Sequence, residues 1–213
     1  ESKEHNVALM VGHLLQYHPV FIEFKKIIRS NKLGLLKYIY SNRLSCGKIR
    51  SEEDVIWSFA PHDASMILSL TQEEPESIQV KTANILQDNI ADIATLHLNF
   101  PSGIKGHISV SWIHPYKEQK LVAICDQGML VFDDTKQWPE KLALFEHSVS
   151  FEDDSFNILK AEPSYISVEE AEPLKRECEH FLNVVAGKIK PLTDGLEGLK
   201  VLNVLTEATL LID

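Results

Sequence analysis

Cysteine is scarce in this sequence, and its three cysteines, Cys46, Cys125 and Cys178, lie far apart. An odd, scattered set without a CxxC pair excludes a disulfide framework and a cysteine-based zinc site, and it is typical of a reducing compartment. The sequence also lacks an apolar run of about eighteen residues and a basic-then-apolar leader. We therefore expect a cytoplasmic protein with no metal and no membrane partner.

Basic residues are also fewer than acidic ones, with 21 Lys and Arg against 31 Asp and Glu, which gives a net charge of -10. Nucleic-acid binding needs clustered Lys and Arg, so no nucleic-acid partner is expected. The nine glycines include no GxGxxG, and there is no P-loop, GxSxG or HExxH. Neither Gly103/Gly106 nor Gly195/Gly198 joins a buried strand to a helix, so the sequence contains no dinucleotide-binding fingerprint.

Hydrophobic periodicity predicts four helices. Apolar residues recur at three- and four-residue spacing, and Asp194 and Glu197 have the spacing of an N-cap and the third residue of a helix. The predicted helices cover residues 19–30, 61–70, 177–186 and a segment that begins after Asp194.

Alternating segments predict a mainly antiparallel sheet. Residues 94–100 and 106–112 flank the turn Pro101-Ser102-Gly103, which predicts a hairpin. Further strands are predicted at 36–44, 121–124, 129–132 and 142–145, and residues 148–163 are interpreted as a long loop. Val7–Val11 is continuously apolar, which predicts a strand buried on both faces whose sheet partners precede this sequence. The order of elements indicates an α+β fold.

The segment Trp57–Asp63 (WSFAPHD) is the sharpest candidate for chemistry. Pro61 is typical of a first helical turn, which would place His62 and Asp63 at a helix start. In one interpretation Asp63 stabilises the helix dipole and His62 makes a local hydrogen bond. In the other, His62 is a general acid/base, since an imidazole with a pKa of about 6.5 suits proton transfer near neutrality.

Several segments resemble one family over nearly the whole chain. GHLLQYHP at 12–19, WSFAPHD at 57–63 and EPLKRECEHFLNVVAGKIKPLTDGLEGLKVL at 172–202 are similar to the glucose–fructose oxidoreductase/inositol dehydrogenase/MocA family. SNRLSCGKIR at 41–50 and SWIHPYKEQ at 111–119 most resemble its branch acting on UDP-N-acetylglucosaminuronic acid, a 3-dehydrogenase.

The resemblance implies a large open, mainly antiparallel sheet with helices on one face, preceded by the last strand of a missing Rossmann domain. On this basis residues 1–15 are the remnant of that dinucleotide-binding domain, and residues 16–213 form a substrate-binding and oligomerisation domain. The missing part would bind NAD or NADP, so we expect this chain alone to lack cofactor binding and activity.

The resemblance also implies roles for individual residues. His62 matches the catalytic histidine, although Ser58 stands where the family often has an aspartate. Tyr17 matches a substrate contact, and only Gly12 and His13 are expected to reach the cofactor.

Four polar residues of one segment are candidates for binding an anionic sugar nucleotide: Asn42, Arg43, Lys48 and Arg50. Arginine grips carboxylates and phosphates through paired N–H groups. Alternatively, these residues form a charged sheet edge.

The implied function is oxidation of a sugar secondary alcohol, with a sugar or nucleotide-sugar substrate and self-association through the sheet face away from the helices. Two alternatives stay open. One is a non-catalytic oligomerising module, and the other is a dehydrogenase of the same family acting on inositol or a simple sugar.

Overall fold

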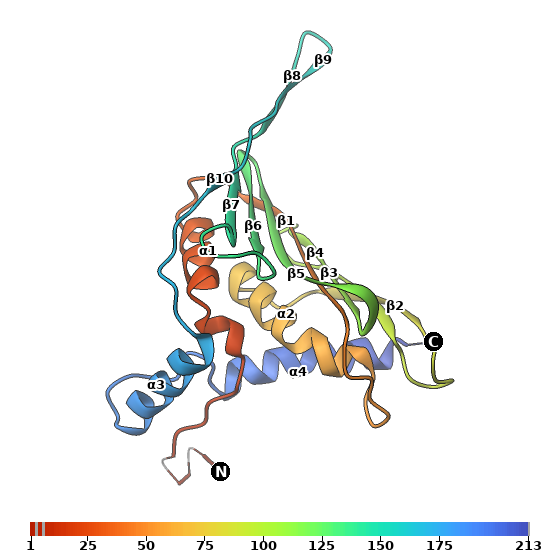
Figure 1. Ribbon diagram of the computed structural model, residues 1–213, viewed down its shortest axis with the longest axis vertical. Helices are drawn as coiled ribbons and strands as arrows, with labels where there is room; N and C mark the ends of the chain where they lie inside the picture. Colours follow the sequence, from red (N-terminus) through yellow and green to blue (C-terminus); the bar gives the residue numbers. More distant parts are fainter. Residues whose placement is uncertain (3, 6, 213) are drawn as a thin grey trace.

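In the computed structural model, which describes residues 1–2, 4–5 and 7–212, an eight-stranded sheet has helices packed against one face (Figure 1). The strands of this sheet are β1 (Leu36–Cys46), β2 (Ser77–Ala83), β3 (Ile93–Asn99), β4 (Lys105–Ser111), β5 (Ile113–Cys125), β6 (Gly128–Asp133), β7 (Leu142–Phe145) and β10 (Ser164–Tyr165). The helices are η1 (Leu14–Tyr17, a 3₁₀ turn), α1 (Pro19–Arg29), α2 (Val55–Thr71), α3 (Pro173–Val185) and α4 (Gly195–Leu210). Within the described residues, no helix is both long and apolar enough to cross a membrane.

The sheet is mainly antiparallel, in the order β10-β7-β6-β5-β1-β4-β3-β2, and among the strands of the described residues only β1 and β4 pair in parallel. The predicted hairpin of β3 and β4 is confirmed, and Gly103 in its turn has a φ of +86°, which glycine adopts without strain. The pairing of β5 with β6 and the strand β7 are confirmed as well. The α+β prediction is therefore correct.

Strand alternation directs one set of side chains to the helices and the other to an open face. On β1, Ile39 and Ser41 are fully buried toward the helix layer. Helix α1 buries Phe21 and Phe24 completely, and α2 lies across the middle of the sheet (Figure 1). Each such apolar side chain contributes roughly 1.5–3 kcal/mol by leaving water. This helix layer fixes α2, the element that contains His62.

Helix α2 begins earlier than the sequence predicts. Asp54 is its N-cap and accepts a hydrogen bond from the backbone N–H of Trp57, so Pro61 lies inside the helix. A proline there removes one backbone hydrogen bond, at a cost of about 3 kcal/mol, but α2 is buried along most of its length and packing outweighs that cost. The prediction that His62 and Asp63 lie in a first helical turn is wrong, and so is a dipole role for Asp63.

Val7–Val11 is extended but pairs with no strand among the described residues, so the predicted strand is absent here. Instead it packs on the start of α4. The N–H of Val11 donates to the carbonyl of Thr193 at 2.8 Å. A Cβ on Gly195 would lie 2.7 Å from Cδ2 of Leu9, and one on Gly198 would lie 2.7 Å from Cγ2 of Val11, so a side chain at either position would displace this segment or its side chains.

The segment interpreted as a long loop contains a two-stranded hairpin, β8 (Ser148–Glu152) and β9 (Ser155–Leu159). Asp153 and Asp154 form its turn with φ of 50° and 57°, the positive angles of the tightest hairpin turns. The loop prediction was wrong because the sequence lacks the glycine that usually marks such a turn. The hairpin projects away from the sheet along the long axis of the molecule (Figure 1).

Candidate functional site

The strongest candidate site lies where three elements meet: the extended segment 7–13, the first half of α2 and the start of α4. A groove of about 440 Å³ opens there beside His13, Trp57 and Pro61. Its other lining residues are mainly apolar and come from residues 9–11 and α4. This volume lies within the range of about 300–1,000 Å³ usual for small-molecule sites.

His62 follows Pro61 on α2, and its ring meets that of His13 edge-on, with 6.5 Å between ring centroids. The Nδ1 atom of His62 is buried and has no hydrogen-bond partner among the described residues. Burial and the nearby positive charge of Arg43 lower the pKa of His62 below 6.5, although Asp63 opposes the shift. His62 is therefore neutral at pH 7 and able to accept a proton.

His13 is held by a partly buried chain of hydrogen bonds. Its Nδ1 lies 2.7 Å from Oε2 of Glu197, and Oε1 of Glu197 accepts from the Ser65 hydroxyl at 2.6 Å. The amide of Gln16 donates to Ser65 at 2.9 Å, and Lys25 donates to Gln16 at 3.1 Å. These bonds join η1, α1, α2 and α4, so they fix the His13 ring relative to His62.

Glu177 on α3 is the second unsatisfied group of this region. It is buried, and its Oε1 has no hydrogen-bond partner among the described residues. A Cβ on Gly12 would lie 3.9 Å from that oxygen, which places the carboxylate against the segment that leads to His13. Burial raises the pKa of Glu177, and the nearby His13 opposes the shift.

Arg43 and Asp63 form a buried ion pair on the other side of His62. The Nε of Arg43 donates to Oδ2 of Asp63 at 2.6 Å and its Nη2 donates to Oδ1 at 3.3 Å, while the Ser41 hydroxyl donates to Oδ1. Asp63 is only 1% exposed. The guanidinium therefore binds a carboxylate of this chain through two of its nitrogens.

The other predicted substrate-binding residues are not all brought together. Asn42 lies on the open face of the sheet, where it donates to Glu118 at 2.7 Å, whereas Arg43 points toward α2. Lys48 and Arg50 lie in the exposed connection between β1 and α2, and Arg50 pairs with Glu53 at 2.9 Å. Only Arg43 of this group lies beside His62.

Tyr17 is the last residue of η1, and it contacts Thr193 just before the start of α4. It is buried, its hydroxyl lies 2.9 Å from the Thr193 hydroxyl, and its ring lies 5.2 Å from that of His180. Burial raises the pKa of Tyr17 above its usual value of 10, with the charge of Glu177 acting in the same direction. Tyr17 is therefore protonated at neutral pH and links the site to α3.

Ser58 lies one helical turn before His62 on α2 and is half-buried. A serine brings no charge, so the carboxylates that act on His62 and His13 come from elsewhere. Asp63 acts on His62, while Glu197 and Glu177 act on His13.

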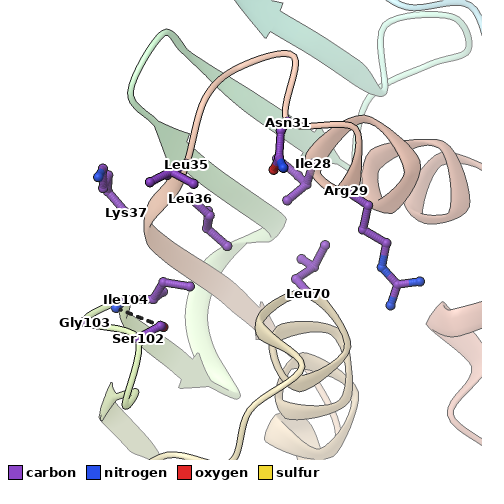
Figure 2. A pocket seen from close by; sticks show the side chains of 10 residues that line it. All are labelled: Ile28, Arg29, Asn31, Leu35, Leu36, Lys37, Leu70, Ser102, Gly103 and Ile104. Carbon is purple, nitrogen blue, oxygen red and sulfur yellow. Dashed lines mark hydrogen bonds between the residues drawn. The ribbon is translucent and has the colours of Figure 1, made fainter.

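A second cavity, of about 410 Å³, lies at the far end of α2, between Ile28, Leu36, Leu70 and the β3–β4 turn (Figure 2). In Figure 2 the charged end of Arg29 points away from this aliphatic lining. It contains no titratable pair and none of the predicted site residues. Across the described part of the chain, no three His, Cys, Asp or Glu side chains gather as a metal site.

The chain matches the family model described as the GFO/IDH/MocA C-terminal domain over residues 21–131. The chain belongs to the GFO/IDH/MocA family. The resemblance in the sequence is confirmed at this level, and the match lies wholly within the sheet-and-helix body described above.

Among curated relatives, UDP-N-acetylglucosamine 3-dehydrogenase of Acidithiobacillus ferrooxidans is 24% identical, over 94% of this chain and 61% of the relative. The solved structure of a protein with that name superimposes with a TM-score of 0.81 at 21% identity, over 99% of this chain and 63% of that one. An oxidoreductase structure from Magnetospirillum magnetotacticum gives 0.79 at 25% identity, over 97% and 64%. The chain thus spans about three fifths of its relatives' length.

Sequence patterns missed the residues that hold the site together. Gln16, Ser65 and Glu177 have no local pattern that indicates burial beside a histidine. Glu197 fits a capping box, but its carboxylate binds His13 and Ser65, and Asp194 alone caps α4. The contacts of Glu197 with His13 and Ser65 depend on α4 packing beside η1, so local sequence patterns do not predict them.

Proposed function

We propose that this chain forms the substrate side of an NAD(P)-dependent oxidoreductase that oxidises a secondary alcohol of a sugar nucleotide, with His62 as the proton acceptor. One observation carries the proposal: the Nδ1 of His62 is buried without a hydrogen-bond partner among the described residues, and His62 adjoins Pro61, which lines the groove. Burial and Arg43 lower the pKa of His62, so its ring is neutral at pH 7. An unsatisfied buried polar atom costs about 1–3 kcal/mol. A bound hydroxyl would recover that cost and place its proton on the imidazole.

Each group of the site has a role in this reaction. His62 takes the hydroxyl proton, and burial and Arg43 lower its pKa so that the imidazole is deprotonated near neutral pH. Glu197 orients His13, whose ring edge limits where a substrate can lie against His62. The free oxygen of Glu177 supplies an acceptor for a second sugar hydroxyl.

The residues present fit only part of a dinucleotide. The mainly apolar groove beside His13 and Pro61 suits packing against the flat face of a nicotinamide ring, whereas the glycines offer no turn for the phosphates of the dinucleotide. When bound, the cofactor supplies the hydride acceptor. His13 lines this groove and Gly12 directly precedes it, so these two residues are the ones of this chain that we propose to reach the cofactor.

The substrate proposal rests on the relative named for UDP-N-acetylglucosamine. That sugar nucleotide lacks the carboxylate of the uronic acid that the sequence suggested. Arg43 would have met such a carboxylate, but Asp63 already occupies two of its nitrogens. We therefore propose the neutral N-acetylhexosamine nucleotide first and the uronic acid second, with Lys48 and Arg50 as candidates for binding its diphosphate.

The test is a substrate panel on the complete gene product. UDP-N-acetylglucosamine, UDP-N-acetylglucosaminuronic acid, inositol and glucose are each offered with NAD⁺ and with NADP⁺, and reduced nicotinamide is followed by absorbance. Turnover of a UDP-sugar well above that of the free sugars supports the proposal. Turnover of inositol or glucose alone would assign the simpler substrate, and no reduction with any pair would favour a non-catalytic module.

Three further expectations complete the proposal. A chain comprising residues 1–213 alone should bind neither NAD nor NADP appreciably, which calorimetric titration tests. The protein should be cytoplasmic. It should also self-associate through the open sheet face, because that face is uncovered and contains half-exposed apolar side chains such as Tyr40 and Val131.

A further inference from the structure

Of the two histidines beside the groove, His13 lines it directly, and it is near two carboxylates from other helices. Oε2 of Glu197 on α4 lies 2.7 Å from its Nδ1. Glu177 on α3 is close enough that His13 opposes the rise in the pKa of that carboxyl. The side chain of His13 is 9% exposed and that of Glu197 is 23% exposed, so the pair leads from the groove toward solvent.

The direction of the hydrogen bonds around Glu197 fixes the tautomer of His13. Lys25 donates to the amide oxygen of Gln16, and the amide nitrogen of Gln16 donates to the Ser65 hydroxyl. That hydroxyl donates in turn to Oε1 of Glu197. An ionised carboxylate only accepts hydrogen bonds, so the proton shared with Oε2 belongs to Nδ1 of His13. The basic atom of the ring is therefore Nε2, which bonds to no other side chain in the described part of the chain.

We infer that His13 and Glu197 carry away the proton that His62 takes from the substrate. The inference rests on the proposed function and adds an exit route to it. The imidazolium of His62 gives one ring proton to Nε2 of His13, and a water molecule spans the gap between rings whose centroids are 6.5 Å apart. His13 then releases its Nδ1 proton to Glu197, which passes it to solvent. One proton enters the relay and one leaves, so the relay needs no oxidant of its own.

The surroundings of His62 explain why such a route is needed. Its Nδ1 is buried, so a proton accepted there is out of contact with water. Arg43 from β1 disfavours a positive charge on this ring, and Asp63, which favours one, is itself paired with Arg43. His13 has no such cation beside it, and its nearest ionic partner is the carboxylate of Glu197. The charges on either side of the two rings therefore favour transfer from His62 to His13.

The start of α4 is built so that the carboxylate of Glu197 is available to His13. Asp194 alone caps the helix, since its side chain accepts from two backbone N–H groups of the first turn. Val11 and Thr193 are joined by two hydrogen bonds, one from the Val11 N–H at 2.8 Å and one to the Val11 carbonyl at 2.6 Å. These bonds hold the segment that leads to His13 against α4.

The first test is Glu197→Gln in the complete gene product, with the UDP-sugar that the wild type oxidises. The amide still accepts the Nδ1–H of His13 but takes no proton, so turnover should fall about 10- to 100-fold, less than for loss of the proton acceptor itself. Added imidazole should restore turnover as its concentration rises, because it replaces the missing base. Glu197→Asp, which keeps a carboxylate, should turn over faster than Glu197→Gln. Asp194→Asn on the same helix is the matched control and should keep the wild-type rate, since asparagine caps a helix equally well.

The outcomes separate the relay from the proposed function. An active wild type with an impaired His62→Asn variant and a Glu197→Gln variant of normal turnover would overturn the relay alone. A slow Glu197→Gln variant that imidazole does not restore would also overturn it, and would leave Glu197 as a residue that only orients His13. A wild type that reduces neither NAD⁺ nor NADP⁺ with any sugar of the panel would overturn both.

Nitrogen NMR of the complete protein with isotope-labelled histidine gives a readout that needs no turnover and no stable Glu197 variant. The His13 ring is assigned by the signals that are lost in His13→Gln. In the neutral ring Nδ1 should carry the proton and Nε2 should be bare, as the hydrogen bond to Glu197 requires. A proton on Nε2 instead would leave no acceptor for the proton of His62 and would overturn the relay.

Discussion

His62 and Asp63 are neighbours on α2, yet their polar atoms are in opposite states. Both carboxylate oxygens of Asp63 are hydrogen-bonded, by Arg43 and Ser41, in a group that is fully enclosed. Nδ1 of His62 is just as enclosed and has no partner among the described atoms. Buried polar groups are normally hydrogen-bonded, so the unpaired Nδ1 of His62 is a candidate for binding a ligand whereas the carboxylate of Asp63 is not. This contrast separates what stabilises α2 from what acts on substrate.

The largest effect is expected for His62, whose Nδ1 has no hydrogen-bond partner among the described residues. His62→Asn, made in the complete gene product, should lower turnover about 10²- to 10⁴-fold while cofactor affinity stays unchanged, because asparagine keeps hydrogen bonding but cannot take the proton. His114→Asn on β5 is the control and should leave turnover intact. Unchanged turnover with a lower melting temperature would return His62 to a structural role.

The pH profile of the wild type extends this test. A general base must be deprotonated, so turnover should fall as pH drops through the pKa of His62. Because burial and Arg43 lower that pKa, the acid limb should lie below pH 6.5. A limb above pH 6.5 would contradict the lowered pKa, and in His62→Asn the limb should vanish.

Arg43→Gln tests the hydrogen-bonded carboxylate of Asp63, and its effect should appear in the free energy of unfolding. Removing the guanidinium leaves the enclosed carboxylate of Asp63 unpaired, which should cost about 3–5 kcal/mol in the free energy of unfolding. Arg50→Gln is the matched control, since Arg50 pairs with Glu53 on an exposed loop, and it should cost less than about 1 kcal/mol. Equal losses in the two variants, measured by denaturant unfolding, would refute the contrast.

Glu177→Gln should give the smallest effect and the opposite sign in stability. Burial raises the pKa of Glu177, so its charge destabilises the fold above that pKa. The variant should be slightly more stable at pH 7, and the gain should disappear as pH falls below about 4.3, the pKa of an unperturbed glutamate. A charged acceptor also binds a hydroxyl more strongly than an amide does, so KM for the sugar should rise about 5- to 10-fold. A loss of stability at pH 7 would instead indicate a hidden partner.

The regular elements were predictable because their patterns are local. Apolar spacing located α1, and alternation located β3 and β4, since each needs only neighbours in sequence. The predicted start of α2 at Pro61 was wrong, because tertiary packing outweighs the cost of about 3 kcal/mol for a proline inside a helix. His62 was found by resemblance to a motif. Its surroundings were not, because Glu177 and Glu197 reach the site only through the fold.

The distance along the chain between His13 and Glu197 has a consequence for synthesis. These residues are 184 positions apart, and the hydroxyl of Thr193 bonds to the carbonyl of Val11 across 182. At roughly 5–20 residues per second, a ribosome takes on the order of 10–40 s to travel that interval. The sheet can therefore form on the nascent chain before Glu197, the hydrogen-bond partner of His13, has been synthesised. A chain released before α4 emerges would have most of the fold and no site.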